Sequence, residues 1–154
     1  MLTRNHLVLL AAMGSAALLL GAFGFQYIVG LAPCHLCLLQ RWPHAAAIVI
    51  GVAAVAIRGA ALPLFGALAA ATSGGIGIYH TGVERGWWPG PDTCTSSPVG
   101  GMSTDDLLNR IMTAPMVRCD DVAWEMLGLS MASWNALASA VLVLFWLLAA
   151  RKTA

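Results

Sequence analysis

The chain has 154 residues, of which 59% are hydrophobic and only 10% are charged. Its mean hydropathy of +0.78 exceeds that of an ordinary water-soluble domain, in which about half of the residues are apolar. The sequence therefore predicts a membrane protein built as a single domain. Its net charge of +1 leaves no basic surface of the kind that binds nucleic acid, so we expect no nucleic-acid partner.

Three uncharged stretches have the length that a membrane-spanning helix requires. They cover residues 7 to 31, 60 to 79 and 131 to 150, and at ~1.5 Å per residue each can cross a hydrocarbon core of ~30 Å. The first stretch is longer than the apolar part of a secretory signal peptide, so we do not expect it to be cleaved.

A fourth span lies between the first two stretches, although polar residues interrupt it. A helix from Pro43 to Ile57 would be only ~22 Å long, whereas one that begins near Leu36 reaches ~33 Å. We therefore expect a span over residues 36 to 57 that includes Arg41. Pro43 should kink this helix or break its first turn, because proline removes a backbone hydrogen bond. The predicted fold class is an all-α bundle of four transmembrane helices.

The positive charges predict the orientation of the bundle. Arg4, Arg58 and the pair Arg151 and Lys152 lie close to span ends, and such cationic segments stay in the cytoplasm. Both termini should therefore be cytoplasmic, and residues 80 to 130 should form a long periplasmic loop. Within this loop, residues 104 to 112 combine a capping threonine with an apolar stripe, which predicts a short amphipathic helix.

All four cysteines lie on the periplasmic side of this topology. Cys34 and Cys37 form a C-x-x-C motif at the outer end of the second span, and Cys94 and Cys119 lie in the loop. Disulfides persist in the oxidising periplasm, so one pair in each region is the economical hypothesis. The helix dipole and Arg41, which shares a helix face with both motif cysteines, favour the reactive thiolate.

Other interpretations of these cysteines stay open. The C-x-x-C pair could be a structural disulfide, or it could bind zinc or copper together with His35 or His44. No second ligand pair completes a closed metal site, so we expect no metal. Cys94 and Cys119 could simply tie down the loop. Two dithiols on one side of a membrane, however, form a relay in which thiolate attack on a disulfide passes electrons from one pair to the next.

Such a relay needs a final electron acceptor. The sequence offers no haem, flavin or iron–sulfur motif, and a lipid-soluble quinone fits. An arginine in hydrocarbon is by default a functional-site candidate, which makes Arg41 a candidate quinone contact. The alternative for Arg41 is that its side chain snorkels to the membrane interface.

The segment Cys34-His35-Leu36-Cys37-Leu38-Leu39-Gln40-Arg41 resembles the disulfide bond formation protein B (DsbB) family. The likeness extends over essentially the whole chain, through Tyr79-His80, Gly82-Val83-Glu84, Gly90-Pro91, Cys94, Cys119, Trp124, Leu127-Gly128-Leu129-Ser130-Met131 and Trp134-Asn135. This resemblance implies a protein-dithiol:quinone oxidoreductase of the bacterial inner membrane. It would reoxidise a periplasmic DsbA-like thioredoxin-fold protein and pass the electrons to ubiquinone or menaquinone.

The resemblance also implies roles for single residues. Cys94 would form the mixed disulfide with the DsbA-like donor, Cys119 would resolve it, and Cys37 would face the quinone as a thiolate. Arg41 matches the family's quinone-proximal arginine. Two further residues are candidate quinone contacts, His80 at the outer end of the third span and Met131 at the mouth of the fourth. A satisfied interfacial imidazole is the alternative for the histidine.

Two other functions compete with this one. A vitamin K epoxide reductase-like protein is also a four-helix thiol relay, but there the membrane C-x-x-C follows the loop cysteines, whereas Cys34 and Cys37 come first here. A disulfide-stapled membrane scaffold without enzyme activity is the alternative from a different class.

Overall fold

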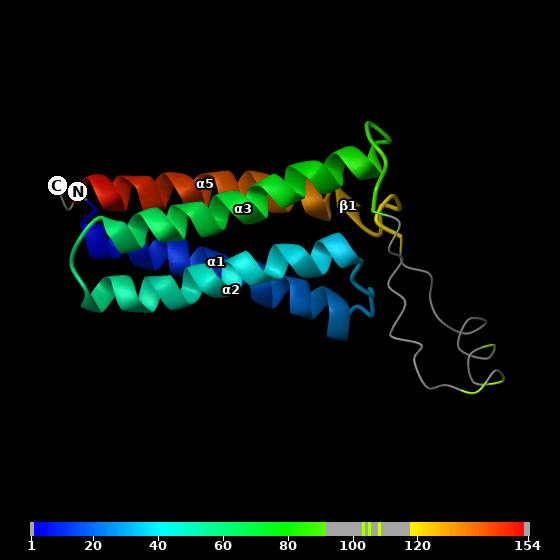
Figure 1. Ribbon diagram of the computed structural model, residues 1–154, viewed down its shortest axis with the longest axis horizontal. Coiled ribbons are helices and arrows are strands. Elements are labelled where there is room, and N and C mark those ends of the chain that lie inside the picture. Colours follow the sequence, from blue (N-terminus) through cyan, green and yellow to red (C-terminus); the bar gives the residue numbers. More distant parts are fainter. Residues whose placement is uncertain (1, 92–102, 104, 106–107, 109–117, 153–154) are drawn as a thin grey trace.

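The structure is a computed structural model that describes residues 2–91, 103, 105, 108 and 118–152. Its long helices form a bundle (Figure 1) and are α1 (Arg4–Tyr27), α2 (His35–Ala56), α3 (Ala61–Glu84) and α5 (Met131–Arg151). All four are long and apolar enough to cross a membrane, which confirms the predicted fold class. Cys94 and most of the predicted helix at residues 104–112 lie outside the described residues.

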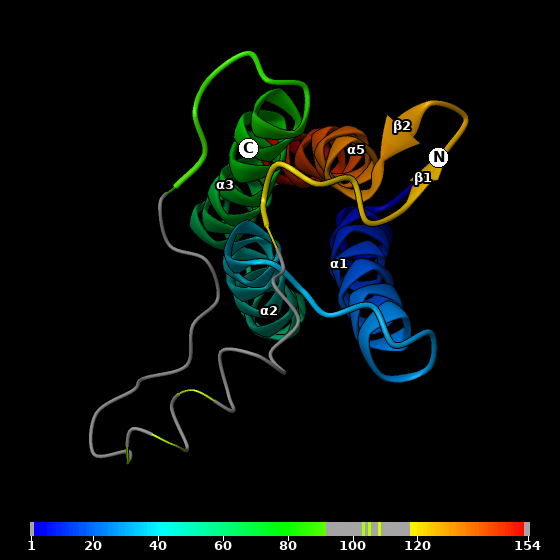
Figure 2. The ribbon, with the colours of Figure 1, turned by 90° about the vertical axis from the view of Figure 1, so that its right-hand side faces the viewer.

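Each helix packs against two neighbours, in the order α1, α2, α3 and α5 around the bundle (Figure 2). Both termini and the turn between α2 and α3 lie at one end, and the segment before α5 lies at the other (Figure 1). The guanidinium of Arg4 donates to the backbone oxygens of Ala54, Ile57 and Gly59 and so connects the start of α1 to the end of α2. The cationic segments that predicted the orientation therefore share one end of the bundle.

Two helices differ from their predicted course. Helix α3 ends at Glu84 rather than near Tyr79, so His80 lies inside the helix. Helix α2 runs without interruption through Pro43, so of the two predicted effects of the proline, a kink or a broken first turn, the break is wrong. In the turn before the proline, Ser73 Oγ of α3 donates to the backbone oxygen of Gln40.

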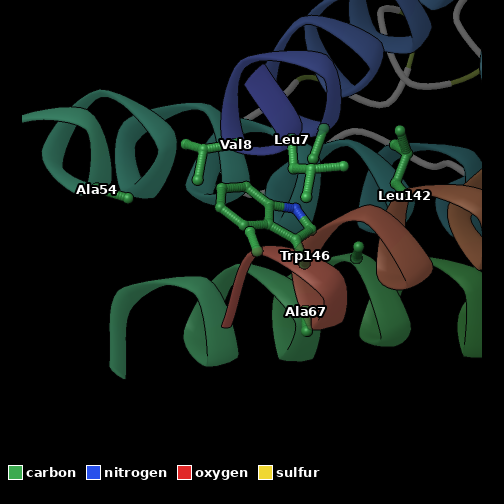
Figure 3. Packing of buried hydrophobic residues seen from close by; sticks show 9 residues of the cluster. Leu7, Val8, Ala54, Ala67, Leu142 and Trp146 are labelled. Atoms are coloured by element: carbon green, nitrogen blue, oxygen red, sulfur yellow. The ribbon is translucent and has the colours of Figure 1, made fainter. Parts of the chain in front are cut away.

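The half of the bundle near the termini has an apolar core around Trp146. Val8 of α1, Ala54 of α2 and Ala67 of α3 are buried around its indole, together with further aliphatic side chains (Figure 3). A Cβ atom at Gly66 would lie 2.6 Å from the indole carbon Cδ2, so only glycine lets α3 approach this closely. The hydrogen bonds that join side chains of different helices inside the bundle, such as those of Gln40 with His80 and Asn135, lie toward the other end.

A short hairpin leads into α5, and the sequence did not predict it. Strand β1 (Glu125–Met126) pairs antiparallel with strand β2 (Leu129–Ser130). Leu127 and Gly128 connect them with φ angles of 55° and 74°, as a two-residue type I′ turn requires. Ser130 then caps α5 by accepting from the backbone N–H of Ser133. The hairpin fixes the segment around Trp124 at the outer end of the bundle.

Candidate active site

Cys34 and Cys37 open helix α2. Cys34 is the N-cap residue, and its sulfur accepts a hydrogen bond of 3.3 Å from the backbone N–H of Cys37. Both residues are free thiols, and the Cys34 thiol donates to the Cys37 sulfur across 2.9 Å. The pair thus lies at a helix N-terminus, where the positive end of the helix dipole favours negative charge on sulfur.

The two sulfurs differ in their surroundings. The hydrogen bond to Cys37, together with burial, raises the pKa of the Cys34 thiol above its ordinary value. Cys34 therefore keeps its proton and shares it with Cys37. A sulfur that receives a hydrogen bond carries negative charge more easily than one that donates it, so Cys37 is the sulfur on which charge collects.

Cys119, which precedes the hairpin in the chain, lies in the same buried cluster as this dithiol. It is 8% exposed and belongs to one buried cluster with Cys34, Leu36 and Val83. The structure thus brings a loop cysteine to the C-x-x-C pair, although the two lie far apart in the sequence. Its predicted partner, Cys94, lies outside the described residues.

An exposed ion pair flanks Cys119. The guanidinium of Arg118 donates to both carboxylate oxygens of Asp120, at 2.9 Å from Nε to Oδ1 and 2.5 Å from Nη2 to Oδ2. These bonds hold the pKa of Asp120 below its ordinary value. The bidentate contact restrains the backbone on either side of the buried cysteine, but an exposed pair contributes little free energy.

His80 approaches the dithiol from α3. Its Nε2 lies 3.5 Å from the Cys34 sulfur and 3.8 Å from Oε1 of Glu84, and its Nδ1 lies 3.1 Å from the Gln40 side-chain nitrogen. The imidazole is 3% exposed. It is therefore held between α2 and α3 by specific polar contacts and does not lie free at the membrane interface.

Two side-chain amides extend the hydrogen bonds of His80 further into the bundle. Gln40 Nε2 donates to the backbone oxygen of Leu36, so its Oε1 is free to accept from Asn135 Nδ2 at 2.7 Å. Asn135 Nδ2 also donates to the backbone oxygen and the hydroxyl of Ser73. Asn135 Oδ1 therefore faces Nε2 of His44, at 2.9 Å. Because a carbonyl oxygen can only accept, each of these contacts fixes which amide atom is nitrogen.

These assignments determine which nitrogen of His80 carries the proton. Gln40 donates to Nδ1, so Nδ1 must accept and the neutral ring carries its hydrogen on Nε2. The N–H of the imidazole therefore faces the sulfur of Cys34. His80 presents a hydrogen-bond donor to the dithiol.

Arg41 is held by contacts to α1. Its guanidinium donates to Oε1 of Gln26 at 2.5 Å and to the backbone oxygen of Ala22 at 3.3 Å. Its Cζ lies 5.0 Å from the ring centroid of Phe23, which adds a cation–π contact. These contacts to a single helix satisfy the charge inside the bundle.

An apolar cavity of ≈ 260 Å³ lies beside Cys37. Its polar lining comes mainly from one stripe of α2, and the rest is aliphatic and aromatic, with Phe25 and Trp124 in ring contact at 5.1 Å between centroids. Most small-molecule sites combine apolar walls with a few polar groups in this way. The stripe of α2 consists of Cys37, Gln40, Arg41 and His44, and the other walls include Leu18, Phe25, Trp124, Met131, Trp134 and Asn135.

A second, smaller cavity adjoins the cysteines, with a volume of ≈ 50 Å³. Arg41, His80 and Met131, which the sequence predicted as quinone contacts, all line this cysteine cavity. Arg41 and Met131 line the apolar cavity as well, whereas His80 does not. Cys37 lines both cavities and Cys34 only the smaller one.

A flat ring with two opposed oxygens fits the apolar cavity. The walls supply aromatic and aliphatic surface for the ring, and the guanidinium of Arg41 and the amide of Asn135 are polar groups that an oxygen can meet. The sulfur of Cys37 lies in the same wall. The residues present are therefore compatible with a quinone next to the dithiol.

The same residues suit a metal ion less well than they suit a quinone. Cys34, Cys37 and His80 offer ligand atoms that all lie within 4.8 Å of one another, a soft set that zinc would accept. However, Nε2 of His80 carries the proton and cannot bind a metal unless the tautomer changes. The Gln40 amide opposes that change because it donates to Nδ1.

Sequence reasoning missed part of this site although a signal was present. Cys37, Gln40, Arg41 and His44 follow the spacing i, i+3, i+4 and i+7, which places them on one face of a helix. A polar stripe of this kind in an apolar span indicates a site inside the bundle. The sequence suggested for His44 a buried packing residue or a metal ligand, and the role of Asn135 requires knowing which helices are neighbours.

Comparisons with known proteins place the whole bundle in one family. A family model described as "Disulfide bond formation protein DsbB" matches residues 4–149. The chain is 32% identical over 135 residues to disulfide bond formation protein B of a Polaromonas species, covering 82% of this chain and 79% of the relative. It is 31% identical over 153 residues to the protein of that name in Verminephrobacter eiseniae, covering 94% and 85%.

A third relative carries the same name. Disulfide bond formation protein B of Albidiferax ferrireducens is 33% identical over 135 residues, covering 80% of this chain and 75% of the relative. No solved structure matches the chain.

Proposed function

Because the chain belongs to the disulfide bond formation protein B family and is a membrane disulfide oxidoreductase, we propose that it reoxidises a periplasmic DsbA-like protein and passes the electrons to a membrane quinone. One observation carries this proposal. The dithiol lies between the loop cysteine Cys119, which packs on Cys34, and the apolar cavity, which Cys37 lines. Electrons that enter from the loop side can therefore leave on the cavity side.

The first part of the relay is thiol–disulfide exchange. Cys94 and Cys119 form a disulfide, a thiolate of the donor attacks Cys94, and the second donor thiol releases the oxidised donor. The reduced loop pair then attacks the Cys34–Cys37 disulfide and regenerates its own. Each exchange breaks one S–S bond and forms another, so two electrons move to the C-x-x-C pair. The burial of Cys119 against Cys34 supports attack at Cys34, which makes Cys37 the leaving sulfur.

The chain's own residues prepare Cys37 for the second part. The N-terminus of α2 stabilises charge on the leaving sulfur, and once Cys34 is released as a thiol, its hydrogen stabilises charge on Cys37 as well. His80 donates toward Cys34 and keeps this sulfur oriented. Arg41, held by Gln26, adds a fixed positive charge at the wall of the apolar cavity. A bound quinone supplies the two-electron acceptor, and Arg41, His80 and Met131 are its proposed contacts.

The proposed location is a bacterial inner membrane with both termini in the cytoplasm. The gathering of Arg4, Arg58 and Lys152 around one surface pocket at the terminal end supports this orientation. A phosphatase fused after Gly101 should be active, since only periplasmic phosphatase folds into an active enzyme. An inactive fusion would contradict both the orientation and the oxidising environment of the cysteines.

The relay itself can be tested by trapping. With Cys119→Ala, the mixed disulfide between Cys94 and the donor cannot be resolved internally, so a covalent complex should accumulate as a reducible band on a gel. Adding Cys94→Ala should abolish it. A complex that persisted without Cys94 would show that the attacking pair is assigned wrongly.

Quinone reduction is tested separately. The purified protein, supplied with a reduced DsbA-like donor and a short-chain ubiquinone or menaquinone, should reduce the quinone at a rate that depends on both substrates. The variant Cys37→Ala should lack this activity but still exchange disulfides between donor and loop. A scaffold without enzyme activity would reduce no quinone in either form.

A further inference from the structure

The hydrogen bonds that run from His80 through Gln40 and Asn135, and so join α3, α2 and α5, end at His44. This residue follows Arg41 by one turn of α2, is 3% exposed and lines the apolar cavity. Its Nε2 contacts Oδ1 of Asn135 at 2.9 Å. Its Nδ1 is buried and has no hydrogen-bond partner among the described residues. A buried polar atom without a partner destabilises a fold, so its presence at a cavity wall points to a ligand.

The tautomer of His44 follows from the amide beside it. Asn135 Nδ2 is fixed by the backbone oxygen of Ser73, so Asn135 Oδ1 is the atom that meets His44. An amide oxygen can only accept, and His44 Nε2 must therefore carry the hydrogen. The neutral ring then has a lone pair and no hydrogen on Nδ1. His44 offers the cavity an acceptor and not a donor.

An acceptor of this kind distinguishes the two redox forms of a quinone. The oxidised ring bears two carbonyl oxygens, which accept hydrogen bonds and cannot satisfy Nδ1. The reduced ring bears two hydroxyl groups, and either can donate to it. Formation of the Cys34–Cys37 disulfide releases two electrons and two protons, and the conversion of a quinone to a quinol takes up both. The partner that Nδ1 lacks is thus formed by the reaction itself.

Resting on the quinone-linked function proposed above, we propose that His44 is a redox-state-selective contact of the quinone site, whose Nδ1 accepts a hydrogen bond from a hydroxyl of the quinol. Asn135 is the positioning residue that holds the required tautomer. His44 lines the cavity and its Nδ1 is buried, and small side-chain shifts of the kind that accompany ligand binding bring a hydroxyl to this nitrogen. The contact favours the product ring over the substrate ring within the site.

Binding of both ring forms can be measured without turnover. Trp124 and Trp134 line the apolar cavity, so quenching of tryptophan fluorescence reports ring binding. The background variant carries Cys34→Ser and Cys37→Ser, which removes the redox reaction and keeps side chains that can cap the helix. Short-chain ubiquinone and its quinol are titrated separately under anaerobic conditions. Quenching by neither form would overturn the proposed quinone function itself.

The ratio of the two affinities tests His44. In His44→Leu the quinol should bind ~5-fold more weakly, the value of one ordinary hydrogen bond, while the quinone changes by less than ~2-fold. His44→Gln keeps a donor for Asn135 and an acceptor for the ligand, so it should retain most of the ratio. Leu18→Ala, on the apolar wall, is the matched control and should weaken both forms equally. An equal loss for both forms in His44→Leu would overturn the proposal and leave the quinone function standing.

A spectroscopic measurement on the unsubstituted ring protects the test against variants that fail to fold. In protein labelled with ¹⁵N-histidine, in the same serine background, Nδ1 of His44 should resonate as an unprotonated ring nitrogen. Addition of quinol should shift this resonance, and addition of quinone should leave it nearly unchanged. Asn135→Leu should mix the two tautomers. A protonated Nδ1 in the ligand-free protein would refute the proposal directly.

Discussion

Replacing Gln40 with glutamate should change the hydrogen-bonding direction at the dithiol. The glutamine amide donates to Nδ1 of His80 and so keeps the imidazole hydrogen on Nε2, facing Cys34. A glutamate carboxylate has the same shape but only accepts. In Gln40→Glu the hydrogen of His80 should therefore move to Nδ1, leaving a lone pair on Nε2 toward the sulfurs. Asn135 keeps its partner, since a carboxylate oxygen still accepts from its amide.

The consequence is a zinc site in the reduced protein. The ligand atoms of Cys34, Cys37 and His80 already lie within 4.8 Å of one another, and Glu84 Oε1 is 3.8 Å from Nε2 of His80. The substitution adds the carboxylate–histidine–metal arrangement, in which a carboxylate behind the imidazole orients it and raises its basicity. Outer contacts of this kind change metal affinity by about 10- to 100-fold, or roughly 1.4 to 2.7 kcal/mol.

The measurement is competition for Zn²⁺ between a chromophoric chelator and the reduced protein in detergent. Gln40→Glu should bind about 10- to 100-fold more tightly than the unsubstituted protein. Gln40→Met, which removes donor and acceptor together, is the control for lost packing, and His80→Phe in the Gln40→Glu background should abolish the gain. Equal zinc affinity in the glutamate and glutamine proteins would refute the tautomer assignment on which the site description depends.

Other predictions test separate parts of the structure. Arg41→Ala should raise the quinone concentration needed for half-maximal turnover while Arg41→Lys retains part of the activity, because lysine keeps the charge but not the planar fork; an unchanged quinone dependence in folded Arg41→Ala would limit the arginine to a structural role. Gly66→Ala places a Cβ 2.6 Å from the Trp146 indole and should cost about 1 to 3 kcal/mol in unfolding experiments, whereas Gly75→Ala, with nothing within 4 Å, should be tolerated. Because the pKa of Asp120 is lowered in the folded protein, its ion pair with Arg118 stabilises the folded segment at every pH above the unfolded pKa of about 3.9. This stabilisation is lost as the pH falls through the lower pKa of the folded state. Labelling of Cys119 by a thiol reagent active in acid should therefore speed up only below about pH 4, and by a small factor because the pair is exposed; an increase already at neutral pH would contradict this.

Much of the fold was predictable from length and hydropathy, because a bilayer demands about 20 apolar residues for each span. The reach of α3 was not, since its last turn contains Thr81 and Glu84, which hydropathy assigns to the loop. Inside the bundle the carboxylate lies near His80 and is nearly buried. The hairpin before α5 was missed for another reason, because strands of two residues show no alternation that a pattern could detect.

The site was predictable only as far as single motifs reach. The C-x-x-C pair and Arg41 stand out in the sequence, and the family resemblance adds the loop cysteines. The contact between Gln40 and Asn135 joins α2 to α5, and nothing local marks either residue as its partner. Proton positions on His44 and His80 depend on this pairing, so they could be derived only after the helices had been placed.

Helical geometry explains how one dithiol can serve two different partners. Cys34 is the N-cap residue of α2 and Cys37 is the third residue of the helix, so the two lie within one turn of each other. The sulfurs of Cys34 and Cys37 are therefore close enough to exchange a hydrogen at 2.9 Å, yet they face different neighbours. Cys34 packs against Cys119, whereas Cys37 begins the stripe that lines the apolar cavity. In the proposed relay, closing the disulfide within a single turn thus passes the electron pair from the loop side of α2 to its cavity side.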